Sequence, residues 1–136
     1  MSADEASGAA AMLAADAASR ALGIEVVELA PGRARLRMPV TELMINGHGI
    51  AHGGYVFLLA DTAFACACNY AGAVTVAAGA DITFVAPVRA GDVLDADAVE
   101  RTRYGRSGVY DVTVRCGEQI VAEFRGRSRT LGASEQ

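Results

Sequence analysis

The clearest pattern of apolar and polar positions lies in the first third of the chain. Over 33–40 the apolar residues alternate with arginines, which is the period-two pattern of a strand with one buried and one solvated face. A second strand-like run covers 24–30, and Pro31-Gly32 between the two runs is a strong turn signal. The pattern predicts a β-hairpin. Before it, apolar positions at helical spacing over 9–22, followed by Gly23, predict a short N-terminal helix.

The most apolar run of the chain, 54–70, is rich in alanine and nearly free of polar residues on every side. A helix that is hydrophobic all round is a buried helix, so this run is predicted to form the centre of the core. The segment before it, 41–54, brings glycine, histidine and asparagine close together. That composition predicts an irregular loop rather than a regular element.

The rest of the chain predicts strands, interpreted as a four-strand meander over 74–86, 92–103, 108–116 and 119–131. An antiparallel sheet wrapped around one central helix is the natural way to bury that helix in so short a chain. We therefore expect an α+β fold in a single domain over 1–136, in which 1–20 is a partly helical N-terminal segment. Because the chain's own sheet covers the helix on one side only, a second protomer is expected to complete its burial.

Composition narrows the class of protein. The chain has 136 residues, of which 52% are hydrophobic and 21% charged, as in a folded globular domain. Its formal net charge of −4 argues against a nucleic-acid or anionic-membrane partner, since such partners need a positive field. No basic region precedes the N-terminal alanines, and no apolar run is long enough to span a bilayer. We expect a cytoplasmic protein without membrane association.

Asp61 is the strongest candidate for chemistry, because it is the only charged residue between Gly54 and Asp81 and lies in the middle of the apolar helix. Burying an unpaired carboxylate costs on the order of several kcal/mol, so a compensating role is expected. That role is either catalytic, or structural with the carboxylate held by backbone amides or an arginine. Buried carboxylates with perturbed pKa values gather at active sites, which favours the catalytic role.

Gly53 and Gly54 begin the same helix. Their N–H groups, the positive end of the helix dipole and the lack of side chains suit an oxyanion hole and a ligand that touches both residues, although a glycine pair also serves turns. Asp61 lies about 12 Å along the helix from Gly53, so one protomer does not bring both groups to one reacting atom. An antiparallel pair of helices does. A homodimer with two sites is therefore the expected catalytic unit.

His48 and His52 lie four residues apart in the glycine-rich loop. With Asp61 they could be drawn as a two-histidine, one-carboxylate metal site, but the glycines between them disfavour regular spacing, and no metal is expected. We expect the ring N–H of His52 to orient the loop or a substrate carbonyl. The alternative is an ordinary role in loop packing. Asn46 could contact the attacking water or the thioester, or serve only the turn.

The stretch from Asn46 to Asn69 resembles the PaaI-like group of hotdog-fold acyl-CoA thioesterases, in which His-Gly-Gly followed by Leu-Ala-Asp-Thr-Ala is the specific part. The similarity continues through 80–88, 107–111 and 124–128. The resemblance implies a hotdog dimer, paired into a homotetramer, that hydrolyses aryl-acyl-CoA of the phenylacetyl-CoA or hydroxyphenylacetyl-CoA type in phenylacetate catabolism. It implies no cofactor, because coenzyme A is part of the substrate.

The same resemblance assigns site residues. It implies Asp61 as general base or nucleophile, the Gly53 N–H as oxyanion donor, and Asn46 and His52 as supporting contacts. It also implies an acyl and pantetheine channel lined by Thr62, Ala80, Asp81 and Phe84. The CoA phosphates need cations, and all 12 basic residues are arginines. The candidates, each of which could equally be ordinary charge on a solvated strand, are Arg101, Arg103, Arg106, Arg125 and Arg127.

Two mechanisms remain open at this point. Either water deprotonated by Asp61 attacks the thioester carbonyl, or Asp61 attacks it directly through an anhydride, and CoA thiolate leaves in both. Two other functions also remain open. A hotdog hydratase or dehydratase would act on an enoyl thioester with a carboxylate and a histidine, and a non-catalytic acyl-CoA binding module would need no buried carboxylate.

Overall fold

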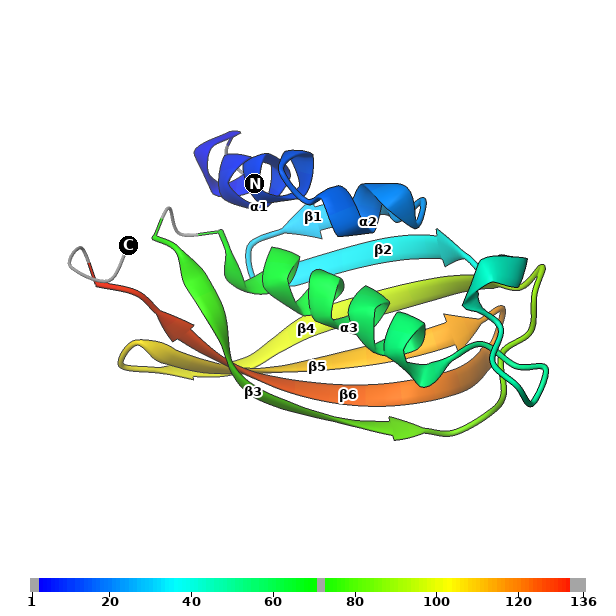
Figure 1. Cartoon of the computed structure of the whole chain (residues 1–136). Coiled ribbons are helices and arrows are strands. Elements are labelled where there is room, and N and C mark those ends of the chain that lie inside the picture. Colours follow the sequence, from blue (N-terminus) through cyan, green and yellow to red (C-terminus); the bar gives the residue numbers. More distant parts are fainter. Residues whose placement is uncertain (1–2, 71–72, 133–136) are drawn as a thin grey trace.

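Six antiparallel strands form one curved sheet, and a long helix lies across one face of it (Figure 1). The computed structural model describes residues 3–70 and 73–132. The strands are β1 (Glu25–Ala30), β2 (Arg33–Pro39), β3 (Thr75–Phe84), β4 (Val93–Tyr104), β5 (Ser107–Cys116) and β6 (Gln119–Thr130). The helices are α1 (Ala3–Ala14), α2 (Ala17–Ala21), the 3₁₀ helix η1 (Glu42–Met44) and α3 (Gly53–Cys68). The predicted α+β architecture, a sheet around a central helix, is confirmed.

The β1–β2 hairpin matches its prediction closely. Gly32 in the turn has φ 72°, a left-handed conformation that glycine adopts without steric cost. Along β2 the side chains alternate strictly between exposed and buried, with the alanine, leucine and methionine facing α3 and the arginines facing solvent. The sequence pattern was sufficient here because one face of this strand is solvated.

The N-terminal helix predicted over 9–22 is two helices in the structure, α1 and α2. Asp16 separates them, with an extended backbone (φ −86°, ψ 90°) that interrupts the helix. Its carboxylate accepts a hydrogen bond from the Ser19 N–H at 3.0 Å and so caps α2. Helical spacing of apolar residues continued through this cap, which is why one helix was expected.

The four-strand meander was wrong in one connection. β4, β5 and β6 are neighbours in chain order, but the sheet order is β1-β2-β4-β5-β6-β3, so β3 pairs with β6 at one edge and β4 pairs with β2. Tight turns join β4 to β5 and β5 to β6 and force those strands to be adjacent. The longer link over 85–92 allows the chain to leave β3 and return on the far side of β5 and β6.

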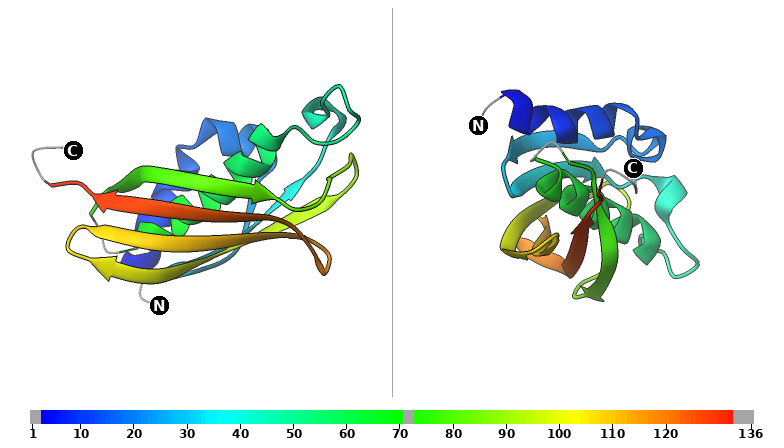
Figure 2. Two further views of the ribbon diagram at one scale, coloured as in Figure 1. Left: turned by 90° about the horizontal axis from the view of Figure 1, so that it is seen from below. Right: turned by 90° about the vertical axis from the view of Figure 1, so that its left-hand side faces the viewer.

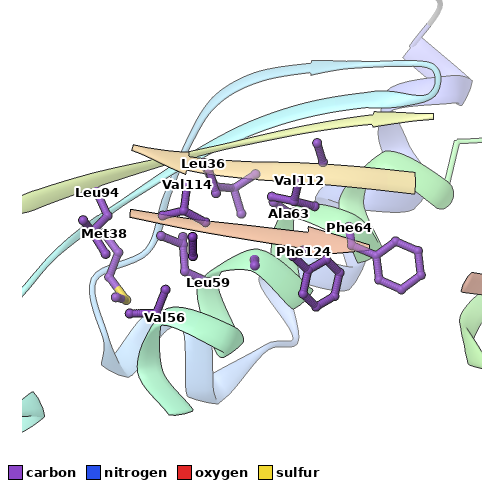
Figure 3. Packing of buried hydrophobic residues seen from close by; sticks show 14 of the residues in the cluster. Leu36, Met38, Val56, Leu59, Ala63, Phe64, Leu94, Val112, Val114 and Phe124 are labelled. Carbon is purple, nitrogen blue, oxygen red and sulfur yellow. The ribbon is translucent and has the colours of Figure 1, made fainter. Parts of the chain in front are cut away.

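Helix α3 lies in the concave face of the sheet, as the end-on view in Figure 2 shows. Its inner residues are fully buried among side chains from β2, β4, β5 and β6, and the close-up in Figure 3 shows Leu59 and Phe64 among them. In β6, a Cβ atom at Gly126 would lie 2.8 Å from the Phe64 ring, so this glycine makes room for the aromatic side chain. The α1–α2 pair lies beside α3 on the same side of the sheet, and no described element covers the opposite face (Figure 2).

Candidate active site

A pocket of about 430 Å³ lies where the start of α3 meets the loop before it and the end of β3. Its apolar wall includes Val56 of α3, Val121 of β6 and the segment 84–88. Polar groups reach it from Asn46 and Gly53. Three of the residues predicted for the site, Asn46, Gly53 and Phe84, therefore line one pocket.

Asn46 shapes the loop over 41–52. Its side-chain Oδ1 accepts hydrogen bonds from the N–H groups of His48 at 2.9 Å and Ile50 at 3.4 Å, and its own N–H donates to the Ile50 carbonyl at 2.8 Å. This is turn chemistry, one of the two roles expected for Asn46. The side-chain NH₂ has no acceptor among the described residues and remains available to a ligand in the pocket.

His52 caps the start of α3. Its Nδ1 accepts a hydrogen bond from the Gly54 N–H at 3.1 Å, so in the neutral ring the proton is on Nε2. The two glycine amides are therefore in different states. The Gly54 N–H is occupied by His52, whereas the Gly53 N–H has no acceptor among the residues that the structure describes. Gly53 is left as a free donor at the positive end of a 16-residue helix.

A side chain at Gly53 would displace the ring of Phe84. A Cβ atom at this position would lie 2.8 Å from Cζ of Phe84, whose ring crosses the start of α3. At Gly54 the nearest atom would be His52 Nδ1 at 3.4 Å, an ordinary contact. An added Cβ atom therefore forces a neighbouring side chain to move at Gly53 but not at Gly54.

Asp61 lies on α3 two turns after Gly53 and is half-buried. It forms no hydrogen bond or ion pair with any described residue. Burial raises the pKa of its carboxyl above the ordinary value, and the negative charge of Asp16 raises that pKa further. Asp61 does not line the pocket of its own chain, in keeping with the separation of about 12 Å along the helix.

One stripe of α3 is left partly uncovered, although the sequence predicted a helix buried all round. The stripe consists of Gly54, Phe57, Leu58, Asp61 and Ala65, which recur at helical spacing. The neighbouring edge strand β3 is also open, because its second edge pairs with no described strand and only its first residue is buried. The helix stripe, with the carboxylate of Asp61 in it, and the free edge of β3 together form one contiguous region.

The other predicted substrate contacts occupy different places. Thr62 is buried, donates to the Leu58 carbonyl at 2.8 Å and contacts the Ser19 hydroxyl at 3.2 Å. Ala80 is half-buried on β3, while Asp81 is exposed and forms an ion pair with Arg127 at 2.8 Å. Thr62 and Asp81 therefore do not line the pocket that contains Gly53 of the same chain.

The five candidate arginines fall into two groups. Arg101 and Arg125 both bind Asp111, and their hydrogen bonds, that of Arg125 above all, lower the pKa of Asp111 to about 2. They lie on the sheet face that turns away from α3, as does Arg127, which forms an ion pair with Asp81. The second group is Arg103 and Arg106, at the end of the β4–β5 hairpin. The Arg103 side chain donates to the Tyr70 hydroxyl at 2.9 Å, just beyond the end of α3.

Sequence reasoning missed two features around the site. One is the pair of Asp16 and Ser19, of which Ser19 contacts α3 at Thr62; Asp is a preferred N-cap residue, and that preference could have indicated the pair. The other is the apolar wall of the pocket, for which no local sequence signal exists. Among the described residues, no group of three His, Cys, Asp or Glu side chains is arranged to hold a metal ion. No helix within 3–70 or 73–132 is long and apolar enough to cross a membrane.

Comparison with known proteins gives consistent matches. Residues 48–123 match a family described as the thioesterase superfamily. The chain is 45% identical over 125 residues to acyl-coenzyme A thioesterase PaaI of Escherichia coli K12, covering 91% of this chain and 89% of that protein. The solved E. coli PaaI protein, from the phenylacetic acid degradation operon, superposes with a TM-score of 0.91 at 43% identity, over 95% of this chain and 94% of the other. A Streptococcus mutans UA159 protein bound to acetyl-CoA superposes with a TM-score of 0.76 at 26% identity, over 80% and 89%.

Proposed function

Because the chain belongs to the thioesterase superfamily, and within it to the PaaI-like acyl-CoA thioesterases of the hotdog fold, we propose that it hydrolyses aryl-acyl-CoA with Gly53 and Asp61 as the central groups. The observation that carries the proposal is the free N–H of Gly53, placed in an apolar pocket at the start of a helix. A donor in that position polarises a thioester carbonyl and stabilises the oxyanion that forms on attack.

The proposed catalytic unit is a homodimer. The uncovered stripe of α3 and the free edge of β3 are apolar and contiguous, as expected of a surface that a second copy covers. Antiparallel pairing of two α3 helices around Phe57 sets Gly53 of one subunit opposite Asp61 of the partner subunit, since Phe57 lies midway between them. A twofold axis then generates two equivalent sites. Pairing of two such dimers into a tetramer stays a prediction from the family resemblance.

In each proposed site the thioester carbonyl oxygen binds the Gly53 N–H, and His52 and Asn46 lie beside it. Asp61 of the partner subunit either removes a proton from the attacking water or attacks the carbonyl carbon itself. The C–S bond breaks, the sulfur leaves as CoA thiolate, and water supplies the oxygen of the free acid. A carboxyl with a raised pKa is the stronger base for the first of these routes, which makes the general-base route our preferred one.

The acyl group is proposed to be an aryl acetyl group. The pocket volume of about 430 Å³ lies within the range of small-molecule sites, and Phe84, Val56 and Val121 give it the apolar wall that a phenyl ring requires. The related E. coli protein comes from a phenylacetic acid degradation operon. For the phosphates of CoA we favour Arg103 and Arg106, because antiparallel pairing brings the far end of one α3 close to the partner's pocket.

The test is release of free thiol from a panel of aryl-acyl, straight-chain and enoyl CoA thioesters. The native protein is expected to prefer aryl-acyl substrates, and Asp61→Asn is expected to lower kcat/KM by at least about 10³-fold while the oligomer persists in size-exclusion chromatography. Asp95→Asn, which removes a carboxylate on the opposite face of the sheet, is the matched control. Hydration of the enoyl substrate, or binding without any turnover, would replace the proposal by a hydratase or a binding module.

Mixing two inactive variants tests the shared site. Subunits with Asp61→Asn and subunits with Gly53→Ala are combined, dissociated and reassembled at equal concentration. Half of the resulting dimers contain both chains and have one intact site of two, so roughly a quarter of the native activity should return. If both groups act within one chain, no activity returns.

A further inference from the structure

A chain of three side chains connects the N-terminal helices to α3 beside Asp61. The Asp16 carboxylate accepts hydrogen bonds from both the N–H and the hydroxyl of Ser19, at 3.0 and 2.6 Å. The Ser19 hydroxyl also contacts the hydroxyl of Thr62 at 3.2 Å. Thr62 is the residue after Asp61, and Ser19 is the only residue of α2 that is buried. The single buried contact of α2 therefore lies next to the candidate catalytic carboxylate.

The donor and the acceptor of each hydrogen bond among these three side chains can be assigned. The ionised Asp16 carboxylate only accepts, so the Ser19 hydroxyl must donate to it. Thr62 is then the one donor left for the Ser19–Thr62 contact, and it shares its proton between Ser19 and the Leu58 carbonyl. Both hydrogen bonds that Ser19 donates therefore end on Asp16, whereas the hydroxyl of Thr62 makes its shorter bond to the Leu58 carbonyl. Such an arrangement stabilises a full negative charge on Asp16 and holds that charge in place over α3.

We propose that Asp16 is a positioning residue for Asp61: its carboxylate is fixed by Ser19, which itself contacts Thr62 of α3, and it keeps a second negative charge beside Asp61 while Asp61 takes the proton from water. This inference rests on the proposed function, because it assumes that Asp61 takes part in hydrolysis. It assigns a catalytic purpose to α2, a helix of five residues that otherwise contributes one buried side chain to the structure.

The pKa values of the two carboxyls are shifted in opposite directions from the ordinary value. The hydrogen bonds from Ser19, the side-chain bond first, lower the pKa of Asp16 and keep it ionised. Burial, and then the Asp16 charge, raise the pKa of Asp61. Two acidic groups whose surroundings separate their pKa values are the arrangement in which one remains charged while the other exchanges protons.

Asp16 is the one charged neighbour that affects Asp61 among the described groups around α3. Arg20 on α2 is exposed and influences Asp16. Glu100 and Arg103 of β4 form their contacts with Tyr70 and Tyr110 at the end of the helix. The cysteines of α3 have pKa values raised to about 12 by burial and are neutral thiols. The inward side chains of β2 are apolar, and the charged groups of β1, β3 and β6 are on exposed positions.

The test is the pH dependence of kcat/KM on the best aryl-acyl-CoA, measured for the native oligomer and three variants. Asp16→Asn removes the charge and keeps a residue that caps helices equally well. Its acidic limb is expected to move to lower pH, and its plateau to fall about two- to fivefold, because a weaker base transfers the proton more slowly. Ser19→Ala, which releases the carboxylate from α3, is expected to move the limb in the same direction by less.

Glu28→Gln is the matched control, since it removes one negative charge from an exposed position on β1 and should leave the profile unchanged. A purely structural role for Asp16 lowers the thermal midpoint without moving the acidic limb, and that result in both variants overturns the inference. Failure of the proposed function looks different: Asp61→Asn then retains activity. Loss of activity in Asp61→Asn together with unmoved limbs in Asp16→Asn and Ser19→Ala refutes this inference alone.

Discussion

The polar groups at the two ends of α3 differ in whether they have hydrogen-bond partners. At the far end, Asn69 donates to the carbonyls of Ala65 and Thr75 at 2.8 and 3.0 Å and accepts from the Thr75 N–H at 2.9 Å. Close by, the Glu100 carboxylate accepts from the hydroxyls of Tyr70 and Tyr110 at 2.8 and 2.7 Å. At the start of the helix, by contrast, the Gly53 N–H and the Asn46 side-chain NH₂ have no partner among the described residues.

This contrast distinguishes polar groups whose hydrogen bonds stabilise the fold from polar groups that are left open to a ligand. A buried polar group with all its hydrogen bonds made contributes to stability, and removing it leaves its partners unsatisfied. A donor left open beside an apolar pocket contributes little until a substrate oxygen arrives. Asp61 lies between the two ends and resembles the groups left open to a ligand, because it is half-buried and has no partner among the described residues of its own chain.

At the two ends of α3, the largest expected effect on activity comes from Gly53→Ala. The added Cβ would lie 2.8 Å from the Phe84 ring, so the ring or the start of the helix must shift and the N–H moves away from the carbonyl oxygen. We expect kcat/KM for thiol release to fall by about 10²-fold, as for loss of one oxyanion donor.

Gly54→Ala is the control for that variant. The same methyl group one residue later meets only His52 at 3.4 Å, and the Gly54 N–H is already occupied. Activity should stay within about threefold of native, since helix propensity favours alanine there. Equal losses in both variants would show that the start of α3 responds as a unit and that Gly53 has no special place.

Two asparagine variants should distinguish the two ends of α3, because one is expected to change mainly stability and the other mainly activity. Asn69→Ala leaves a buried N–H and two carbonyls of the backbone without their partner and should lower the free energy of unfolding by about 2–3 kcal/mol. The kcat of the folded fraction should remain near native. Asn46→Ala should do the reverse, with a smaller loss of stability and several-fold lower kcat/KM. Urea unfolding at fixed protein concentration, with thiol-release assays, measures both.

The smallest expected effects concern the pH dependence of stability. The pKa of Asp61 is raised in the folded chain, so its contribution is fully present below the ordinary value of 3.8 and is lost as pH rises through the folded value. Asp61→Asn should therefore be more stable than native at pH 7 and equal to it below about pH 4. Urea midpoints measured across this pH range test the prediction.

Asp111→Asn should change the pH dependence of stability in the opposite direction to Asp61→Asn. The hydrogen bond from Arg125, followed by that from Arg101, lowers the pKa of Asp111 to about 2, so its contribution is present above 3.8 and is lost as pH falls toward 2. This variant should be less stable than native at pH 7, by under about 1 kcal/mol because the pair is on the surface. A stability curve of Asp61→Asn that resembled that of Asp111→Asn would mean that Asp61 is paired in the assembled protein.

The sequence predicted those elements that a local pattern specifies. The alternation in β2 and the turn at Gly32 defined the first hairpin, and the apolar run defined α3 to within two residues. It did not predict that β3 pairs with β6, because alternation states which face of a strand is buried and not which strand lies beside it. The break at Asp16 was also missed, since an N-cap inside continuous helical spacing changes no apolar position.

The candidate site divides in the same manner. Gly53 and Asn46 could be placed together because they lie a few residues apart in one loop and the adjoining helix. Phe84 reaches the same pocket from β3, and only the family resemblance indicated it. The arginines could not be sorted from sequence, because their acidic partners come from neighbouring strands: Asp111 for Arg101 and Arg125, and Asp81 for Arg127. Cross-strand pairing is fixed by register, which the local pattern leaves open.

The position of β3 at the sheet edge, joined only to β6, also bears on how the protein is made. During translation β3 leaves the ribosome well before β6, and until β6 follows it has no neighbouring strand. The nascent chain then exposes the unpaired edges of β3 and the apolar side of α3 that β6 later covers, a surface prone to association with other unfinished chains. The pocket wall closes only when β6 inserts between β5 and β3, so the pocket is completed late in synthesis, and a stall before residue 119 leaves a chain without it.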